Sequence, residues 1–485
     1  MNYSYRKKNI NFVILINIIV IVSSIILGVI NLGLSTDYSP LLYSIISIIC
    51  VIWCFSSWMF LTKERFSPYI IFLLSCFLFW LGQTFLYALN IRAGNFELYY
   101  MYGDKELLAA EIFTCIGFLF LHLGALLNYK FNSINEVSCI EKIEDKLLVK
   151  SMKLVIIPIF LFSGIGFMLE LINKIETSVT TGYRTIYEDT SLVSGLSNII
   201  NSLDMFFIPS LFTLFVVYKH KKNMRNIFTV LVFFIFIGNI IIGLRGYAFA
   251  LIISFIWLYS NQVKKFKTKH FLMLMISGVI GLVLISVVSD FRNMSDKTIQ
   301  SFFTLISDNI LFGNPIFESI AEFGGSMFPM IETMNIVNHI EDFGFGTTYI
   351  SSILAIIPSA LFGGYSFAEQ AALATWLKES LSMNYGPGYS LIAEAYYNFG
   401  WFGTFFMSIL GFLIIKVLYP KSLSKDKQIL KNIFVAISIF YLVIYSRSSV
   451  LLLVRYLFYS TGVLYVLIMI VYNHLKSRYR LNIAN

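Results

Sequence analysis

Charged residues are scarce in this sequence. Asp, Glu, Lys and Arg make up only 13% of its 485 residues, whereas about 25% is usual in soluble domains. Apolar side chains account for 58%, and the mean hydropathy is +0.77. This composition excludes a chain that folds in water, and with it disorder, a coiled coil and a nucleic-acid-binding protein. We therefore expect an all-α, polytopic integral membrane protein.

Cysteine is also scarce, and familiar cofactor motifs are missing. None of the 5 cysteines forms a C-x-x-C metal spacing, and most lie in apolar runs where they are expected to pack. The sequence has no P-loop and no GxGxxG. It also has no Asp-x-Asp spacing for a divalent metal. These absences argue against a disulfide scaffold, an ATP-driven pump and a sugar-nucleotide transferase, and we expect no metal or other cofactor.

Long apolar runs dominate what is present. A helix needs roughly 20 apolar residues to cross about 30 Å of hydrocarbon. We predict twelve such helices, near 10–32, 41–61, 69–89, 108–129, 154–173, 203–218, 227–243, 246–260, 271–289, 401–419, 432–446 and 450–472. The seventh and eighth are separated by a tight turn at Gly243-Leu244-Arg245-Gly246. The first run is expected to be a span, since it is too long for a signal peptide and no small-x-small site follows it.

The distribution of charge predicts the orientation of these helices. With Arg6, Lys7 and Lys8 in the cytoplasm, most of the 36 Lys and Arg residues fall in short inner loops, and most of the 27 acids fall outside. Short inner loops rich in Lys and Arg follow the positive-inside rule. We therefore interpret the net charge of +9 as an orientation signal and predict that both termini are cytoplasmic.

One outer segment, 290–400, has no convincing spanning run. A structureless loop of that length is uncommon and is usually functional. Within it we expect amphipathic helices at 301–337 and 366–381, and an interfacial or re-entrant segment at 349–362. The predicted organisation is a nine-helix region at 1–289, a large outer loop at 290–400 and a three-helix region at 401–485.

Several arginines lie on the outer side, against the general bias. The four of most interest are Arg245, Arg292, Arg447 and Arg455. Charge in or near a membrane is expensive and by default functional, and a guanidinium matches phosphate oxygens bidentately. These arginines could converge on a pyrophosphate. Alternatively, each reaches lipid headgroups or pairs with an acid such as Asp204 or Asp290.

The most specific stretch runs from Gly386 to Gly403. A Gly-Pro-Gly turn is expected to lead into a short helix that breaks at Gly400 and enters the tenth span. Glu394 lies on that short helix near the membrane surface. Partly desolvated there, its carboxylate could take part in acid–base chemistry. Alternatively, it pairs with an arginine or caps a helix.

Three further side chains are candidates on the outer side. His339 is the one histidine in the outer loops and could serve as a base, although it could equally be polar loop surface. Tyr389 and Tyr396 could stack on sugar rings or lie in the aromatic belt of the membrane. The sequence leaves these alternatives open.

The stretch from Gly386 to Gly403 resembles the end of the large outer loop in bacterial O-antigen polymerases, the Wzy family. Phe317–Gly324 and Gly346–Tyr349 fit the preceding part of that loop, and the helix-rich plan is also similar. Some members of the wider group carry an Arg-x10-Gly pattern in two outer loops. Arg184 to Gly195 fits this pattern, whereas Arg292 has no glycine at that spacing.

The resemblance implies a membrane glycosyltransferase of the GT-C type. It would transfer the growing glycan from undecaprenyl pyrophosphate onto the next lipid-linked repeat unit, at the periplasmic face of the bacterial inner membrane. The implied roles are pyrophosphate binding for Arg245, Arg292, Arg447 and Arg455, glycan binding for Arg184, Tyr389 and Tyr396, and catalysis for Glu394 and His339. Its partners would be the undecaprenyl-pyrophosphate-linked oligosaccharide, membrane lipid, and a chain-length regulator and flippase of the same pathway, with no nucleic acid.

Three alternatives stay open. An O-antigen ligase would share the helices, loop and arginines but accept lipid A–core. A flippase for lipid-linked oligosaccharides, which is a transporter, should lack the large outer loop and place its charges in the centre of the bundle. A structural or assembly protein would have the same topology but would leave Arg455 inside a span unexplained.

Overall fold

The computed structural model describes residues 3–34, 39–94, 96–131, 146–180, 203–266, 314–337, 339–420 and 428–484, and isolated residues between 287 and 307. Within this part of the chain the structure is helical. Its one strand-like pairing there is a single bridge between Val337 and Glu341.

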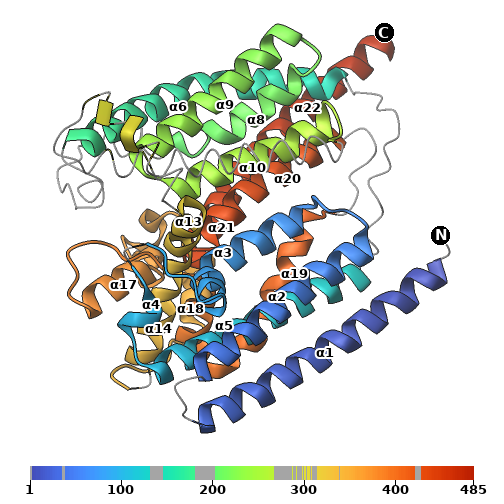
Figure 1. Ribbon diagram of the computed structural model, residues 1–485. Coiled ribbons are helices and arrows are strands. Elements are labelled where there is room, and N and C mark those ends of the chain that lie inside the picture. The colour runs from blue at the N-terminus through green and yellow to red at the C-terminus, as the bar shows by residue number, and fades with distance from the viewer. Residues whose placement is uncertain are drawn as a thin grey trace. The chain divides into compact units, whose positions relative to one another are not determined.

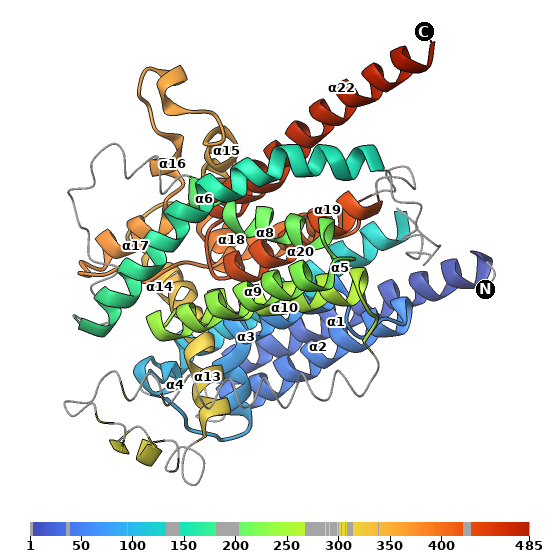
Figure 2. The same cartoon turned by 90° about the horizontal axis from the view of Figure 1, so that it is seen from above.

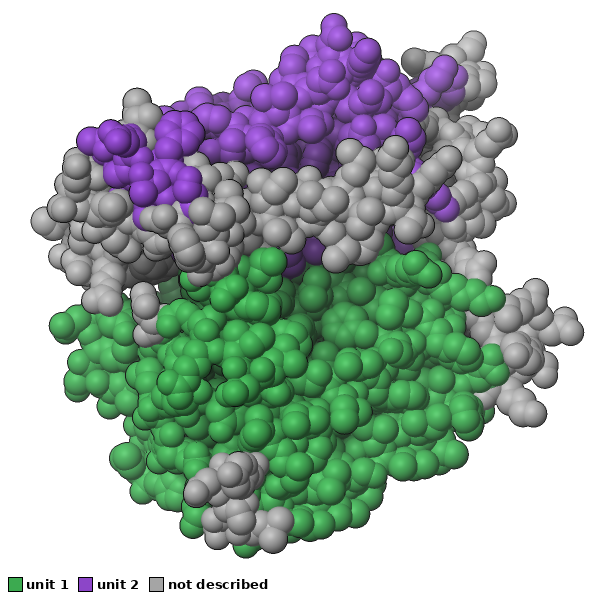
Figure 3. All heavy atoms as spheres, in the orientation of Figure 1, with its two compact units in different colours: residues 1–135, 313–421, 442–453 green, residues 136–312, 422–441, 454–485 purple. Residues whose placement is uncertain are grey.

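The chain folds as two compact units, coloured separately in Figure 3. Unit 1 comprises residues 1–135, 313–421 and 442–453, and unit 2 comprises 136–312, 422–441 and 454–485. Unit 1 contains α1 (Tyr3–Leu34), α2 (Ser39–Thr62), α3 (Pro68–Ala88), α4 (Leu98–Met101), α5 (Asp104–Phe131), α13 (Pro315–Gly324), η2 (Gly325–Met327), α14 (Phe328–Ile336), α15 (Thr347–Leu354), η3 (Ser359–Phe362), α16 (Phe367–Gln370), α17 (Leu373–Ser380), α18 (Leu391–Phe399), η4 (Gly400–Phe402) and α19 (Gly403–Leu418). Unit 2 contains α6 (Lys146–Thr180), α8 (Phe207–Val217), α9 (Lys222–Ile242), α10 (Arg245–Gln262), η6 (Leu457–Val463) and α22 (Leu464–Ala484). Both units share α20 (Gln428–Tyr445) and α21 (Val450–Tyr456).

Nine helical segments in the described residues are long and apolar enough to cross a membrane. They are Asn9–Gly33, Ser39–Thr62, Pro68–Ala88, Asp104–Phe131, Lys146–Ser178, Lys222–Ile242, Leu391–Leu418, Gln428–Tyr445 and Val450–Tyr479. Each coincides with a run predicted from the sequence, because about 20 apolar residues in a row have few other stable environments. The chain is therefore a multi-pass membrane protein.

The other three predicted spans have different outcomes. The run at 203–218 forms α8, an apolar helix of 11 residues. The run at 246–260 forms the 18-residue α10, whose polar ends lower its mean hydropathy. The run at 271–289 lies outside the described residues except for Val287. The turn between the seventh and eighth runs is as predicted: α9 ends before Gly243, whose φ of +99° suits glycine, and α10 begins at Arg245.

Unit 1 is built on close contact between α5 and α19. A Cβ added to Gly124 would lie 1.8 Å from the carbonyl oxygen of Ser408, and one added to Gly411 would lie 2.0 Å from that of Leu121. Glycine at both positions therefore lets the two helix backbones touch. Such small-residue contacts are the usual basis of tight helix packing in membranes.

Short helices gather at one end of this bundle. In Figures 1 and 2, α4, α14, α17 and α18 cluster at one end of α1, α2, α3, α5 and α19, while the start of α1 lies at the other end. Of the amphipathic helix predicted at 301–337, the part from Pro315 to Ile336 is divided into α13, η2 and α14, and most of 301–313 lies outside the described residues. The helix predicted at 366–381 is divided into α16 and α17. The interfacial segment predicted at 349–362 forms α15 and η3, separated by a turn before Pro358.

Candidate active site

Glu394 is the most enclosed of the predicted site residues. It lies in the first turn of α18, which Ser390 caps, and its side chain is 0% exposed. Its Oε1 accepts a hydrogen bond from Thr348 Oγ1 at 2.8 Å, and its Oε2 accepts one from the backbone N–H of Val450 at 2.6 Å. The carboxylate therefore joins α18 to the start of α15 and the start of α21.

Asn398, one turn further along α18, completes this network. Its Nδ2 donates to Thr348 Oγ1 at 2.8 Å and to the carbonyl oxygen of Glu394 at 2.9 Å. Its Oδ1 accepts from the backbone N–H of Gly346 at 2.9 Å. Gly346 has a φ of +85°, which glycine adopts without strain. Buried polar groups that are all bonded in this way hold one arrangement firmly.

The network leaves both carboxylate oxygens of Glu394 engaged by protein donors. In this arrangement the side chain positions three segments relative to one another. The role of Glu394 as a proton acceptor stays a prediction. His339 differs, because it lies exposed in the turn that follows α14. Its side chain is therefore accessible.

The two predicted glycan-binding tyrosines are buried. Tyr389 shares a hydrogen bond with Thr333 at 2.9 Å, and burial raises the pKa of its hydroxyl well above the usual value. Tyr396 packs against Phe113, with ring centroids 5.2 Å apart, and against Trp401. Both rings contact protein side chains, and their glycan role stays a prediction.

Arg447 is exposed in the turn between α20 and α21. Its guanidinium lies 5.6 Å from the centre of the Phe79 ring on α3, in a cation–π arrangement. The same turn is fixed to α3 by Trp80, whose indole N–H donates to the carbonyl oxygen of Ser446 at 2.8 Å. Arg447 is thus held against α3 in unit 1.

The other predicted arginines belong to unit 2. Arg245 is the first residue of α10, and Arg455 lies near the end of α21, immediately before the π-helix η6. Short π-helical segments are frequent at functional sites. Arg455 makes no hydrogen bond or ion pair with another residue that the structure describes. Arg184 and Arg292 lie outside the described residues.

Unit 2 also contains a carboxyl pair that the sequence analysis did not combine. Glu170 of α6 forms an ion pair with Lys174, and Asp204 lies beside Glu170. The Tyr441 hydroxyl donates to the carbonyl oxygen of Met205 at 2.9 Å, which closes the pair off beside α20. An acid inside the apolar run 154–173 was the available signal.

A second missed acid is Glu111 in unit 1. It is 0% exposed on α5, near Ser44, Ser47 and Tyr99. Its position inside the apolar run 108–129 is again the sequence signal, since a carboxyl within a span is rare. Among the described residues, no group of three or more His, Cys, Asp or Glu side chains could hold a metal ion.

These features define a polytopic membrane protein with charged side chains at helix ends and a cluster of short helices at one end of its bundle. A family model described as O-antigen polysaccharide polymerase Wzy matches residues 12–478 of the chain. The chain therefore belongs to the Wzy family, and the resemblance seen at Gly386–Gly403 is confirmed. Comparison with curated proteins and with solved structures gave no match. The chain is accordingly an enzyme of polysaccharide biosynthesis that acts in a membrane on lipid-linked oligosaccharide repeat units.

Proposed function

We propose that this enzyme extends a surface polysaccharide by transferring the growing glycan from undecaprenyl pyrophosphate onto the next lipid-linked repeat unit, at the periplasmic face of the inner membrane. The observation that carries the proposal is the family match over residues 12–478. It favours a polymerase over a ligase or a flippase, because it covers nearly the whole chain rather than one shared segment.

The fold in this proposal is of the GT-C type, and its topology has twelve helices with both termini in the cytoplasm. The arrangement within unit 1 supports it. The short helices of 314–399 lie at the end of the bundle opposite the start of α1 (Figure 1). An N-terminus in the cytoplasm would thus place these helices on the outer side, which is also where the charge distribution puts the large loop.

The reaction needs a leaving group to be stabilised and a proton to be removed. The hydroxyl of the acceptor sugar attacks the anomeric carbon of the donor, the bond from that carbon to the pyrophosphate oxygen breaks, and undecaprenyl pyrophosphate leaves with the electron pair. Arg455, Arg245 and Arg447 would offset the developing charge on the pyrophosphate. From their sequence positions alone, Arg292 is assigned to the pyrophosphate and Arg184 to the glycan.

The proton acceptor in this proposal is His339, and Glu394 has a positioning role. The assignment follows from access. His339 is exposed, whereas Glu394 would have to release Thr348 or Val450 before it could meet a sugar hydroxyl. Glu394 instead fixes the end of the large loop against the start of α21.

The test is the glycan ladder of a deletion strain, separated by gel, with the wild-type gene restored as a control. Loss of the ladder with a single repeat unit still attached to its lipid supports a polymerase. Loss of all glycan would contradict it, because deleting a ligase or a flippase prevents any glycan from being attached. A ladder of unchanged length would also contradict it, because deleting an unrelated protein leaves chain extension intact.

A further inference from the structure

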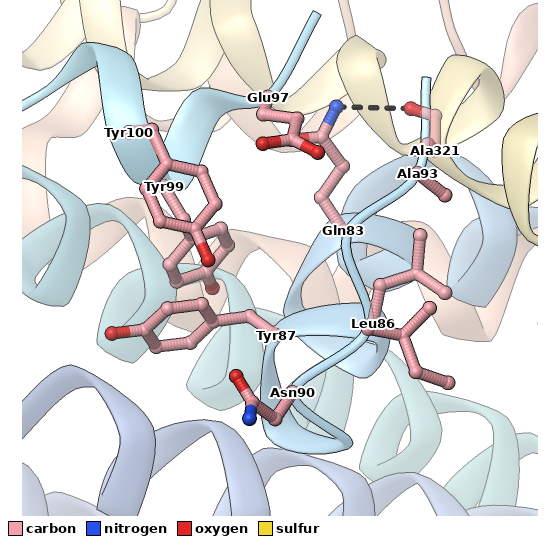
Figure 4. A pocket seen from close by; sticks show the side chains of 10 residues that line it. Gln83, Leu86, Tyr87, Asn90, Ala93, Glu97, Tyr99, Tyr100 and Ala321 are labelled. Carbon is pink, nitrogen blue, oxygen red and sulfur yellow. Dashed lines mark hydrogen bonds between the residues drawn. The ribbon is translucent and has the colours of Figure 1, made fainter.

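A pocket of about 320 Å³ lies in unit 1 where α3 ends (Figure 4). Its lining comes from the end of α3, the segment that follows it, α4 and one residue of α13. That volume includes space open to solvent, and the enclosed part is small, so the pocket suits contact with a single ring better than a long lipid. The site lies apart from the Glu394 network in sequence, and no residue predicted from the sequence belongs to it.

The base of the pocket is rigid. Gln83 Nε2 donates to the carbonyl oxygens of Phe96 at 2.6 Å and Ala321 at 2.9 Å, and its Oε1 accepts from the backbone N–H of Leu98 at 2.8 Å. Gln83 thereby ties α3 to the following segment and to α13. The pocket is therefore shaped before any ligand arrives, which reduces the entropy cost of binding.

Helix α13 approaches α3 closely at this point. A Cβ added to Gly324 would lie 2.3 Å from the backbone nitrogen of Gln83, so only glycine permits the contact. Tyr102 adds a second tie, because its hydroxyl donates to Glu332 of α14. The pocket is thus formed jointly by the segment between α3 and α5 and by the large loop that carries the family motif.

One side of the pocket is aromatic. Tyr87 and Tyr99 are stacked with ring centroids 4.1 Å apart, and the side chain of Tyr100 is 50% exposed. Arg92 holds Tyr100 in place: its guanidinium lies 4.1 Å from the ring centre, and its Nε donates to the hydroxyl at 2.9 Å. Figure 4 shows the three tyrosine rings together, facing Leu86 across the pocket. The negative face of an aromatic ring attracts the weakly positive C–H groups of an apolar ring face.

The polar groups of the pocket are available for a ligand. Neither the Glu97 carboxylate nor the Asn90 side-chain amide makes a hydrogen bond or ion pair with another residue that the structure describes. A carboxylate accepts hydrogen bonds from two neighbouring hydroxyls, and an amide both donates and accepts. Glu97 disfavours a phosphate or other anion here, and the nearby guanidinium of Arg92 disfavours a cation.

We propose that this pocket binds one uncharged sugar ring of the repeat unit. The C–H face of the ring would lie on the tyrosines, and its hydroxyls would bond to Glu97 and Asn90. The inference rests on the proposed function for the presence of a glycan at this end of the bundle. It makes the pocket a holding site that keeps the glycan beside the large loop during transfer.

The experiment measures binding without turnover. The probe is the lipid-free oligosaccharide released by mild acid from the lipid-linked repeat units of the host, titrated onto the full chain in nanodiscs by calorimetry. We expect Glu97→Gln and Tyr100→Ala each to raise the dissociation constant about tenfold or more, as for loss of a bond to a charged group. Glu106→Gln, an exposed acid on α5 outside the pocket, and Tyr365→Ala, an exposed tyrosine of the large loop, are the matched controls and should bind normally.

Each outcome decides the inference. Weaker binding in both pocket variants, with normal membrane accumulation and normal binding in both controls, supports the sugar site. Failure of the wild-type chain to bind the oligosaccharide, equal binding by all variants, or displacement of the oligosaccharide by choline would overturn it. The glycan ladder is scored separately, so a chain that binds sugar but whose deletion leaves the ladder intact would sink the proposed function and leave the pocket standing.

Discussion

At the scale of single residues, the buried polar groups of the site already form hydrogen bonds with donors from the protein itself. Glu394 accepts from Thr348 and Val450, which are 46 and 56 residues away in sequence. A single sequence carries no signal of such contacts, because they depend on how distant segments pack. The short helix and its break at Gly400 were predictable from local chemistry, whereas the partners of Glu394 were not.

Two substitutions at Glu394 separate positioning from catalysis. In Glu394→Gln the amide oxygen can still accept from Val450 N–H, but the amide nitrogen faces the Thr348 hydroxyl, whose hydrogen loses its acceptor, so we expect slightly reduced accumulation and a ladder that is still extended. In Glu394→Ala two buried groups lose their partner, which costs about 1–3 kcal/mol each, and both accumulation and extension should fall. Immunoblots and glycan gels measure the two effects.

His339→Ala should accumulate normally and lose extension about 10²-fold. The roles would be reversed if Glu394→Gln abolished extension while His339→Ala did not.

Arg455 tests the pyrophosphate contact. Arg455→Ala should abolish chain extension, because a half-buried guanidinium fork that bonds to no other described residue is available for phosphate oxygens. Arg455→Lys keeps the charge but not the fork, so we expect it to restore only a small part of the activity. The measurement is the ladder length at matched protein levels. Full activity of the Lys variant would mean that charge alone is needed at this position.

At the scale of helices, hydropathy and glycine placement explain most of what forms. The nine spans follow from runs of about 20 apolar residues, a property that is local and therefore visible in the sequence. The divisions within 301–337 and 366–381 were not predicted. The first occurs at Gly324-Gly325, where the glycine pair and the following Pro329 were an available signal, whereas the second, at Ala371-Ala372, has no such helix breaker.

The contact between α5 and α19 can be tested at one glycine. Gly124→Ala places a methyl group where the Ser408 carbonyl oxygen lies 1.8 Å away, so the helices must separate. We expect a loss of about 1–3 kcal/mol or more in stability, as for overpacked cores, seen as a lower melting temperature in detergent. Gly33→Ala is the control, because nothing lies within 4 Å of its added Cβ. Equal melting of the two variants would show that α5 and α19 are not in backbone contact.

At the scale of the whole molecule, the family and the membrane character could be predicted, whereas the way distant segments combine could not. The motif at Gly386–Gly403 and the charge in the loops are local features that can be seen directly in the sequence. The pocket beside α3 depends instead on Gln83 meeting Ala321, 238 residues away. The same distinction applies to Glu170 and Asp204, which only the fold brings together.

The topology as a whole depends on two helices in unit 2. Helix α8 has 11 residues and α10 has 18. At about 1.5 Å per residue they are about 16 Å and 27 Å long, against about 30 Å of hydrocarbon. The proposed twelve-helix arrangement requires both to cross, with α8 extended by the turns on either side of it.

Reporter fusions at residues 140, 222, 266 and 425 should then report cytoplasm, and fusions at 95, 185 and 340 should report the outer side. The two helices can be separated by parity. Outward signals at both 222 and 266 would mean that α8 does not cross, whereas an outward signal at 266 alone would mean that α10 does not. The first result would put Arg245 on the cytoplasmic side and remove it from the proposed pyrophosphate site, whereas the second would leave Arg245 on the outer side.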